Sequence, residues 1–434
     1  MLQRAIIRTG APATPGLVST RAWARMPSPP SSLMLELEAA LTQILGVIPP
    51  PTTERIPLTD ARGRILAEPL RSPIDLPLFS NSAMDGYALQ SSDIASATPG
   101  APVPLRLAGR VAAGSSFQGK VESGSCVRLF TGSPMPDGAD AVVMQEDTRT
   151  DPGRPGEVLI LNSVQPGENL RHRGEDVKCG AIVADRGQEL TTGRIALLAA
   201  VGLGQVAVSR PPLVGILATG SELREVCQPL EPGQIYESNR AALVALVQCA
   251  GGIPRVFPLI PDSLAATRSA LNEALNHCDV LVTSGGVSVG EMDFIRPAFE
   301  ASGGELGFWQ VAIKPGRPFV FGRRGSKFLF GLPGNPASAL VTFLLLVRPA
   351  LRRWQGAAEI ALPSHTGVLA EPLANPGDRR HFVRVTVNPA GEVRSAGAQV
   401  SHAVSSLAAA NGLVDLPART TLPAGKTVQV MRWD

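Results

Sequence analysis

Residues 279–293 read D-V-L-V-T-S-G-G-V-S-V-G-E-M-D, and this stretch predicts the central feature of the fold. Val280 to Val282 is a short apolar run rich in β-branched residues, which is typical of a buried strand. Two glycine-containing turns follow, and helical spacing resumes at Glu291. A glycine turn before a helix N-terminus attracts anions, so the stretch indicates a phosphate-binding unit. A tight turn without a ligand explains this stretch, taken alone, equally well.

The chain around this stretch alternates between the two kinds of apolar pattern. Alternation of strands and helices predicts βαβ units, and hence a doubly wound parallel sheet with helices on both faces. In such sheets ligands bind outside the carboxyl ends of the strands. The expected strands are 213–217, 256–260, 280–282, 319–321 and 327–330, and the expected helices are 239–249, 264–276, 292–301 and 337–354.

The loops at these strand ends hold nearly all the unusual glycine, proline and charged residues of the region. The carboxylates of Glu222, Asp262 and Asp293 are expected to converge there with two cations, Lys314 and Arg317. Carboxylates beside cations in a glycine-lined crevice suit a magnesium ion, an oxyanion and a phosphorylated substrate. The loops are T-G-S-E-L (219–223), P-D-S (261–263), S-G-G-V-S-V-G (284–290), K-P-G-R-P (314–318) and G-L-P-G-N-P-A-S (331–338).

The composition is that of a globular protein with several domains. The 434 residues are 44% hydrophobic and 18% charged, and 44 Gly and 39 Pro indicate a β-rich part. A net charge of +3 gives no support to a nucleic-acid partner. Five scattered cysteines without a C-x-x-C motif favour reduced thiols in the cytoplasm. The longest apolar run, 339–347, is too short for a membrane span.

The order of patterns predicts a multidomain α/β plus β chain. Residues 1–32 are rich in arginine, proline and serine, and we expect a disordered or non-native extension there, with a transit peptide as the alternative. The expected parts that follow are a helical and extended linking domain (33–72 and 163–210), an inserted β-rich domain (73–162), the α/β domain (211–358) and a C-terminal β-barrel-like domain (359–434). Further helices are expected at 33–48, 61–67 and 195–201, and further strands at 103–107, 126–130, 141–145, 382–387 and 428–432.

Three polar loops in and beside the inserted domain are further candidates for function. Asp75 and Asp85 lie on one loop, although Asp85 before Gly86 also suits an ordinary turn. Thr131 lies on the second loop. The third, R-H-R-G-E-D (171–176), contains Asp176 and equally suits a surface network of ion pairs.

Taken together, these motifs resemble the molybdopterin molybdenumtransferase family, which includes bacterial MoeA and the E domain of gephyrin. The resemblance runs in order from about Leu33 to the C-terminus. It implies a homodimer of four-domain subunits that inserts molybdate into adenylyl-molybdopterin and releases AMP, with Mg²⁺. The motifs are S-A-M-D-G-Y-A, R-H-R-G-E-D, T-G-S-E-L, Q-I-Y-E-S-N-R, S-G-G-V-S-V-G-E-M-D-F, K-P-G-R-P and G-L-P-G-N-P.

The resemblance also implies roles for individual residues. The molybdate site is expected at Lys314, Arg317, Ser338, Arg384 and Ser401. The metal and phosphates are expected at Glu222, Asp262 and Asp293, and the catalytic set adds Asp85, Thr131 and Asp176 in a site shared between subunits. The cofactor-binding residues are expected to be Thr219, Gly220, Ser284, Gly285, Gly286, Ser288, Gly290, Pro315, Gly316, Gly334 and Asn335.

The chain departs from the family pattern at three positions. Ser221 stands where the family commonly has an acid, and Gln310 and Arg317 stand where members have lysine. Two other functions stay open: a molybdopterin adenylyltransferase acting one step earlier, and a non-catalytic scaffold like gephyrin. The first of these is also the expected upstream partner. A preference for tungstate over molybdate is open as well.

Overall fold

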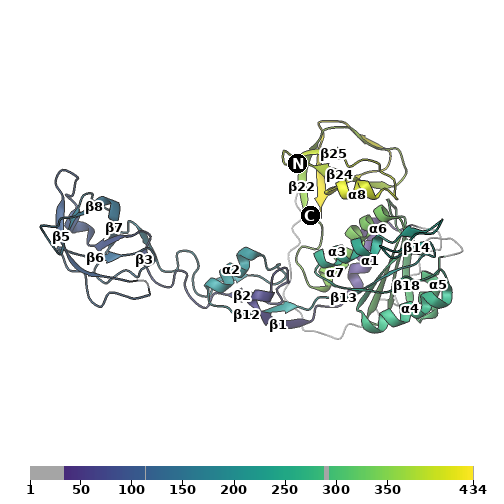
Figure 1. The fold of residues 1–434 in the computed structure, drawn as a ribbon, viewed down its shortest axis with the longest axis horizontal. Coiled ribbons are helices and arrows are strands. Elements are labelled where there is room, and N and C mark those ends of the chain that lie inside the picture. The colour runs from purple at the N-terminus through teal and green to yellow at the C-terminus, as the bar shows by residue number, and fades with distance from the viewer. Residues whose placement is uncertain (1–33, 113, 288–292, 434) are drawn as a thin grey trace. The chain divides into compact units, whose positions relative to one another are not determined.

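The computed structural model describes residues 34–112, 114–287 and 293–433 (Figure 1). The chain forms two compact units. Unit one contains the described residues up to 50, then 211–354 and the chain from 360 onward, and unit two contains 51–210 and 355–359. Within the described ranges, no helix has both the length and the apolarity that a membrane crossing would require.

A six-stranded sheet forms the centre of unit one. Four neighbouring strands are parallel, but β20 pairs antiparallel with β21 and β18 pairs antiparallel with β20. The expectation of a purely parallel sheet is therefore wrong at one edge. The order is β16 (Ile253–Val256), β13 (Leu213–Ala218), β17 (Val280–Ser284), β21 (Lys327–Leu332), β20 (Pro318–Arg324) and β18 (Glu305–Gln310).

The antiparallel edge arises from a hairpin that the sequence encodes locally. Arg324 pairs with Lys327, which leaves a two-residue turn, and Gly325 adopts a φ of +60° there. Two-residue hairpin turns need positive φ, and glycine adopts it without steric cost. The turn sends β21 straight back along β20 without a crossover helix.

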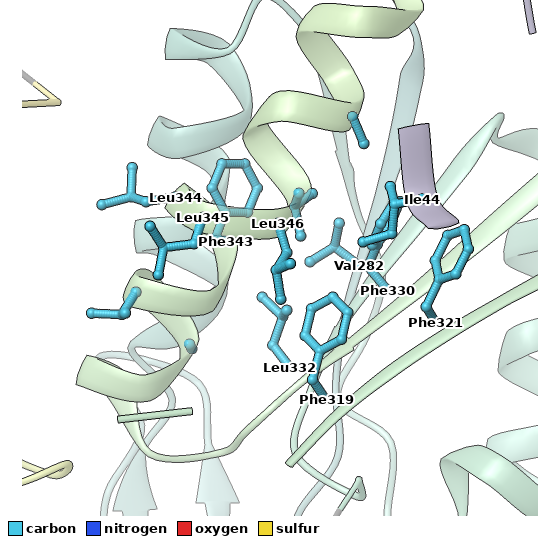
Figure 2. Packing of buried hydrophobic residues seen from close by; sticks show 14 of the residues in the cluster. Ile44, Val282, Phe319, Phe321, Phe330, Leu332, Phe343, Leu344, Leu345 and Leu346 are labelled. Atoms are coloured by element: carbon cyan, nitrogen blue, oxygen red, sulfur yellow. The ribbon is translucent and has the colours of Figure 1, made fainter. Parts of the chain in front are cut away.

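Helices cover both faces of this sheet, as expected for a doubly wound fold. One face packs against α1 (Leu37–Val47), α3 (Asn239–Cys249), α6 (Pro336–Thr342) and α7 (Arg348–Trp354), and the other against α4 (Leu264–His277) and α5 (Ile295–Ala301). Figure 2 shows the first of these cores, where Phe319, Phe321 and Phe330 lie below Phe343 to Leu346.

Several expected elements differ from those observed. The helix expected at 337–354 is interrupted by a π-helical turn, η5 (Phe343–Val347), whose five side chains are all buried. The strand expected at 256–260 is β16, which ends at Val256 because Pro258 cannot donate to a strand ladder. The helix expected at 61–67 is absent from these described residues, since Gly63 turns the chain with a φ of +77°.

Helix α1 lies in unit one, although we expected residues 33–72 to begin the linking domain. Leu37, Ala40 and Ile44 follow helical spacing and are buried in the core of the large sheet. The helix begins at Leu37 and not at residue 33, because Leu35 instead forms a bridge with Val311.

The C-terminal part of unit one is a closed β-barrel with its own apolar core, which confirms the barrel-like domain. An additional pairing of β24 with β26 closes the ring, and helix α8 (Val404–Ala409) precedes β26. The short strand β19 (Ile313–Lys314) of K-P-G-R-P pairs with β24. The barrel strands are β22 (Ser364–Leu369), β24 (Arg380–Val387), β25 (Glu392–Ser395), β26 (Gly412–Leu416) and β28 (Thr427–Arg432), and β23 (Leu373–Asn375) pairs with β27 (Thr420–Leu422) beside them.

Unit two contains the inserted β-rich domain, whose six-stranded sheet has an apolar cluster on each side. The sheet order is β7 (Ala141–Met144), β4 (Gly86–Leu89), β6 (Ser125–Leu129), β5 (Val103–Arg110), β9 (Glu157–Ile160) and β8 (Thr148–Thr150). The rest of the unit has α2 (Thr192–Ala200) and the paired strands β1 (Thr53–Pro57) with β12 (Gln205–Ser209), β2 (Leu70–Arg71) with β11 (Ile182–Ala184), and β3 (Asn81–Ser82) with β10 (Leu170–Arg171).

Candidate functional site

A pocket of about 610 Å³ opens at the carboxyl ends of the parallel strands of unit one. It lies where the rule for doubly wound sheets places a ligand. Ten residues expected from the sequence line it together. They are Thr219, Gly220, Glu222, Asp262, Ser284, Gly285, Gly286, Asp293, Gly334 and Asn335. The expected residues Ser288 and Gly290 lie outside the described part of the chain.

The glycine turn after β17 is built for close approach of two loops. Gly285 and Gly286 have φ of +88° and +67°. A Cβ at Gly285 would lie 2.6 Å from the carbonyl oxygen of Thr219, and one at Gly286 would lie 2.8 Å from the Thr219 hydroxyl. Both positions therefore need glycine for space as well as for φ. The buried Thr219 hydroxyl has no hydrogen-bond partner among the described residues.

Asn239, at the start of α3, ties two of the glycine loops together. Its side-chain amide donates to Ser284 Oγ at 2.7 Å and to the carbonyl oxygen of Gly334 at 2.6 Å. Sequence reasoning gave Asn239 no role, although it lies in the motif Q-I-Y-E-S-N-R. The amide fixes the pocket floor because it bridges the loops that follow β17 and β21.

Arg240 braces the wall beside the pocket and was also missed. Its side chain is buried at 6% exposure. It donates to Glu237 Oε2 at 2.8 Å, to Glu225 Oε2 at 2.6 Å and to the carbonyl oxygen of Phe257 at 2.7 Å. Each of the three guanidinium nitrogens thus donates a hydrogen bond that positions the wall, and Glu237 itself lines the pocket. The spacing of three residues between Glu237 and Arg240 on a helix start was the available signal.

Ser221 holds one of the pocket carboxylates in place. Its backbone N–H donates to Asp262 Oδ2 at 2.9 Å, and the Asp262 N–H donates to Ser221 Oγ at 3.2 Å. The serine that departs from the family pattern therefore makes two reciprocal hydrogen bonds with Asp262. It positions this acid without adding a charge of its own.

The carboxylates Glu222, Asp262 and Asp293 line one pocket but do not form a closed metal cage. Over the described ranges, no group of three or more His, Cys, Asp or Glu side chains is placed to hold a metal ion. Mg²⁺ commonly keeps several waters and binds through one or two carboxylates together with substrate phosphates. The oxygen donors present fit that mode of binding. The assignment of all three acids as metal ligands stays a prediction.

A second group of expected residues gathers where K-P-G-R-P meets the barrel. Strand β19 sets Lys314 opposite His381 of β24. The Ala337 N–H donates to the carbonyl oxygen of Ser401 at 3.0 Å, which brings Ser338 close to the barrel loop. Arg317 donates to Gln310 Oε1 at 3.4 Å. In the part of the chain described, these residues are not among those lining the 610 Å³ pocket.

Arg384 is the most deeply buried cation of this group, with 0% exposure. Its Nη2 donates to the carbonyl oxygens of Ala398 at 2.7 Å and Val400 at 3.1 Å, and its Nε donates to Ser406 Oγ at 3.0 Å. Burial lowers the pKa of this guanidinium. Its Nη1 is buried without a partner among the described residues, so one donor direction is open to a ligand.

His381 lies beside the same cations and was not expected from the sequence. It is 4% exposed, and both ring nitrogens lack a hydrogen-bond partner in the described ranges. Burial, together with the charges of Lys314 and Arg384, lowers its pKa to about 4. Two buried basic side chains with unpartnered nitrogens, beside the half-buried Lys314, are suited to an oxyanion.

We expect His381 to make stability depend on pH. The ring is neutral in the folded protein down to a pKa of about 4, but in the unfolded chain it binds a proton below its ordinary pKa of 6.5. The unfolded state therefore binds more protons between these values, so its contribution to stability falls as pH drops through this window. The loss is up to about 3 kcal/mol.

Urea unfolding at pH 7, 6, 5 and 4 measures this effect. The His381→Gln variant is expected to lose less stability than the wild type over this range. The control is His365→Gln, which removes an exposed histidine from the same barrel and is expected to behave like the wild type. Equal slopes for the wild type and His381→Gln would contradict the assignment.

The remaining expected residues lie in unit two. Asp85 accepts hydrogen bonds from the backbone N–H and the hydroxyl of Thr131, both at 2.8 Å, and these bonds lower its pKa. The sequence placed these two residues on separate polar loops, and the structure brings them into contact. Asp176 is exposed. In the same loop, Arg173 donates to Asp75 Oδ2 at 2.6 Å, so part of this charge cluster is a surface ion pair.

Comparison with known protein families covers nearly the whole chain. The family model described as "MoeA N-terminal region (domain I and II)" matches residues 35–202. The model described as "Probable molybdopterin binding domain" matches 215–353, and "MoeA C-terminal region (domain IV)" matches 366–433.

Curated relatives and a solved structure agree with these matches. A molybdopterin molybdenumtransferase of Haemophilus influenzae is 39% identical over 404 residues, covering 92% of this chain and 98% of the relative. Molybdopterin molybdenumtransferase 2 of Mycobacterium tuberculosis is 39% identical, covering 87% and 94%. The crystal structure of the molybdopterin biosynthesis moeA protein from Pyrococcus horikoshii OT3 aligns with a TM-score of 0.79 at 31% identity, over 92% of this chain and 100% of that one.

Proposed function

The chain belongs to the MoeA family of molybdopterin molybdenumtransferases, and from this premise we propose that it inserts molybdate into adenylyl-molybdopterin and releases AMP. Family membership makes it a transferase enzyme of molybdenum cofactor biosynthesis. The observation that carries the finer proposal is the presence, in one unit, of a glycine-lined pocket with carboxylates and a buried cluster of basic side chains.

The pocket supports binding of the adenylyl-molybdopterin phosphates. Gly285 and Gly286 have no side chain, so a ligand can approach the backbone N–H groups at the end of β17. Anions bind at this place in doubly wound folds. Asn239 fixes the geometry of these loops before a substrate arrives. Preorganised donors are effective because no reorganisation is needed during the reaction.

The pocket carboxylates would hold Mg²⁺ together with the substrate phosphates. When bound, the ion supplies neutralisation of negative charge on the pyrophosphate. Asp262, held by Ser221, and Asp293 are the proposed ligands, with Glu222 beside them. The chain's own contribution is to hold these oxygens at one edge of the pocket.

The basic cluster supports binding of molybdate as the second substrate. Lys314 and Arg384 supply charge, Arg384 offers an unpartnered Nη1, and Ser338 and Ser401 offer hydroxyls. An oxygen of water or of molybdate then attacks the phosphorus of the adenylyl group, and the bond to the bridging oxygen breaks with that oxygen staying on the molybdopterin phosphate. Attack by water gives AMP directly, whereas attack by molybdate gives a mixed anhydride that water hydrolyses to AMP and molybdate. The two dithiolene sulfurs replace oxygens of molybdate, which leave as water with the thiol protons. Positioning and charge neutralisation supply most of the rate, and no protein nucleophile is required.

We further propose that the protein acts as a cytoplasmic homodimer. In this arrangement Asp85, Thr131 and Asp176 serve the site of the other subunit. The direct contact between Asp85 and Thr131 supports a common role for these two residues. The upstream adenylyltransferase would deliver the adenylylated substrate.

The test is AMP release from adenylyl-molybdopterin by the purified protein with Mg²⁺, with and without molybdate. Release that depends on molybdate is expected, and Asp262→Asn is expected to lower its rate at least a hundredfold through weaker alignment of the phosphates. Glu300→Gln, an exposed acid at the end of α5, is the matched control and is expected to retain the wild-type rate.

Two outcomes would replace this proposal. If AMP is released equally fast without an oxyanion, AMP release is not coupled to molybdate insertion, and the insertion step is not supported. Adenylylation of free molybdopterin from ATP would favour the adenylyltransferase function. Substituting tungstate for molybdate in the same assay measures the oxyanion preference.

A further inference from the structure

The inserted β-rich domain has a cavity of its own, of about 530 Å³, formed by unit two alone. Tyr87, Arg110, Arg128 and Phe130 form its aromatic and cationic part, and Thr148 and Thr150 of β8 also line it. None of the sequence motifs assigned a role to this group. Its size suits a small organic ligand.

The two arginines are neighbours held flat against aromatic rings. Arg110 and Arg128 pair directly across β5 and β6. The Arg128 guanidinium lies 4.9 Å from the centre of the Tyr87 ring, and the Arg110 guanidinium lies 4.8 Å from that of Phe130. The rings fix both guanidinium planes through cation–π contact. A preorganised pair of guanidinium groups loses little side-chain freedom when it binds.

The positive charge of the cavity lining is not balanced by a carboxylate among the described residues of that lining. The cavity's described lining contains two arginines and no acidic side chain. Like charges opposite each other on neighbouring strands destabilise a sheet unless an anion compensates them. Arg128 Nη1 is buried without a hydrogen-bond partner among the described residues, although Arg128 also donates to Gln145. An anion with several oxygens would satisfy this donor.

The apolar surface beside the cations extends this inference from an anion to an aromatic ligand. Leu107, which is 38% exposed, lines the cavity together with Phe130. Guanidinium planes and exposed aromatic rings are surfaces on which flat heterocycles stack. We propose that this cavity is a second binding site, for a phosphorylated heteroaromatic ligand of nucleotide size, with its phosphate on Arg110 and Arg128.

The site adjoins a residue of the proposed reaction, but it does not depend on that proposal. The Gln145 N–H donates to the Asp85 carbonyl oxygen at 3.0 Å, so the chain that lines the cavity also supports the Asp85–Thr131 pair.

Hydrogen–deuterium exchange of the full chain with AMP tests the proposal, because it locates binding in each unit separately. AMP is expected to protect peptides covering β5, β6 and β8, half-maximally at a concentration at least tenfold lower than inorganic phosphate or adenosine requires. Arg110→Gln, at the exposed end of β5, is expected to raise the AMP concentration for half-protection at least tenfold.

Arg149→Gln is the matched control. It removes the same charge from β8 between Thr148 and Thr150, and its side chain points to the opposite side of the strand. It is expected to leave protection unchanged. Absence of protection in unit two, equal effects of the two substitutions, or equal protection by phosphate alone would overturn the proposal. Protection of residues 213–224 in unit one reports separately on the proposed function.

Discussion

Arg384→Met is expected to lower molybdate-dependent AMP release at least a thousandfold. The substitution keeps an unbranched apolar stem but removes the buried guanidinium. Nη1 of this group is unpartnered among the described residues, Nη2 holds the loop before α8, and Nε holds Ser406 of α8. Charge-assisted hydrogen bonds contribute roughly 1.5–3 kcal/mol each, and about 4 kcal/mol corresponds to a factor of a thousand in rate.

The assay is AMP release at increasing molybdate concentration. We expect the apparent affinity for molybdate and the maximal rate to fall together, because the side chain proposed to bind the oxyanion also shapes the barrel loop. Arg394→Met, an exposed arginine on β25 of the same barrel, is the control and should match the wild type. A folded Arg384→Met protein with unchanged molybdate dependence would restrict Arg384 to bracing residues 398–406.

The 610 Å³ pocket could be predicted because its determinants are local. Gly285 and Gly286 follow an apolar β-branched run, and the carboxyl ends of parallel strands must meet at one edge of the sheet. Glu222 lies in the loop that follows β13. Asp262 lies just after Ile260, which forms a parallel bridge with Thr219. Sequence order alone therefore brought these residues to one place.

The missed residues depend on contacts between distant segments. Asn239 has its role because Ser284 and Gly334 approach it, and neither approach is visible in the local pattern. His381 looks like a polar residue of an ordinary strand until β19 pairs with β24 and buries it. The cation–π pair on the inserted sheet likewise requires the register of β5 against β6.

The secondary structure expected from the sequence differs from the observed one where residue propensities do not distinguish between two local structures. Strand β18, which was not expected at all, has two register shifts against β20, the first of them at Gly307, and it joins the sheet only through that pairing. The apolar run 343–347 suits a continuous helix, yet it forms a π-helical turn with all its side chains buried. Burial on every side selects this geometry, and periodicity cannot distinguish it from an α-helix.

The second large effect is expected in the core of unit one, where Phe330→Ala should lower the free energy of unfolding by about 3–5 kcal/mol. Phe330 is 0% exposed, and its ring centre lies 5.2 Å from that of Phe321 and 6.4 Å from that of Phe319 (Figure 2). Removing the ring leaves a cavity that these neighbours cannot fill, because both strands are fixed on each side by further pairing.

Urea unfolding followed by tryptophan fluorescence measures this loss, because Trp309, Trp354 and Trp433 all belong to unit one and the Trp354 ring lies 6.2 Å from that of Phe328, on the same strand as Phe330. Phe330→Leu should cost less, because it retains part of the buried volume. Phe79→Ala, at 42% exposure in unit two, is the control and should leave this transition unchanged. A loss below about 1 kcal/mol for Phe330→Ala would mean that the core collapses around the missing ring. Because β21 leads directly into the loop that carries Gly334 and Asn335, a loosened strand should also weaken substrate binding in the 610 Å³ pocket.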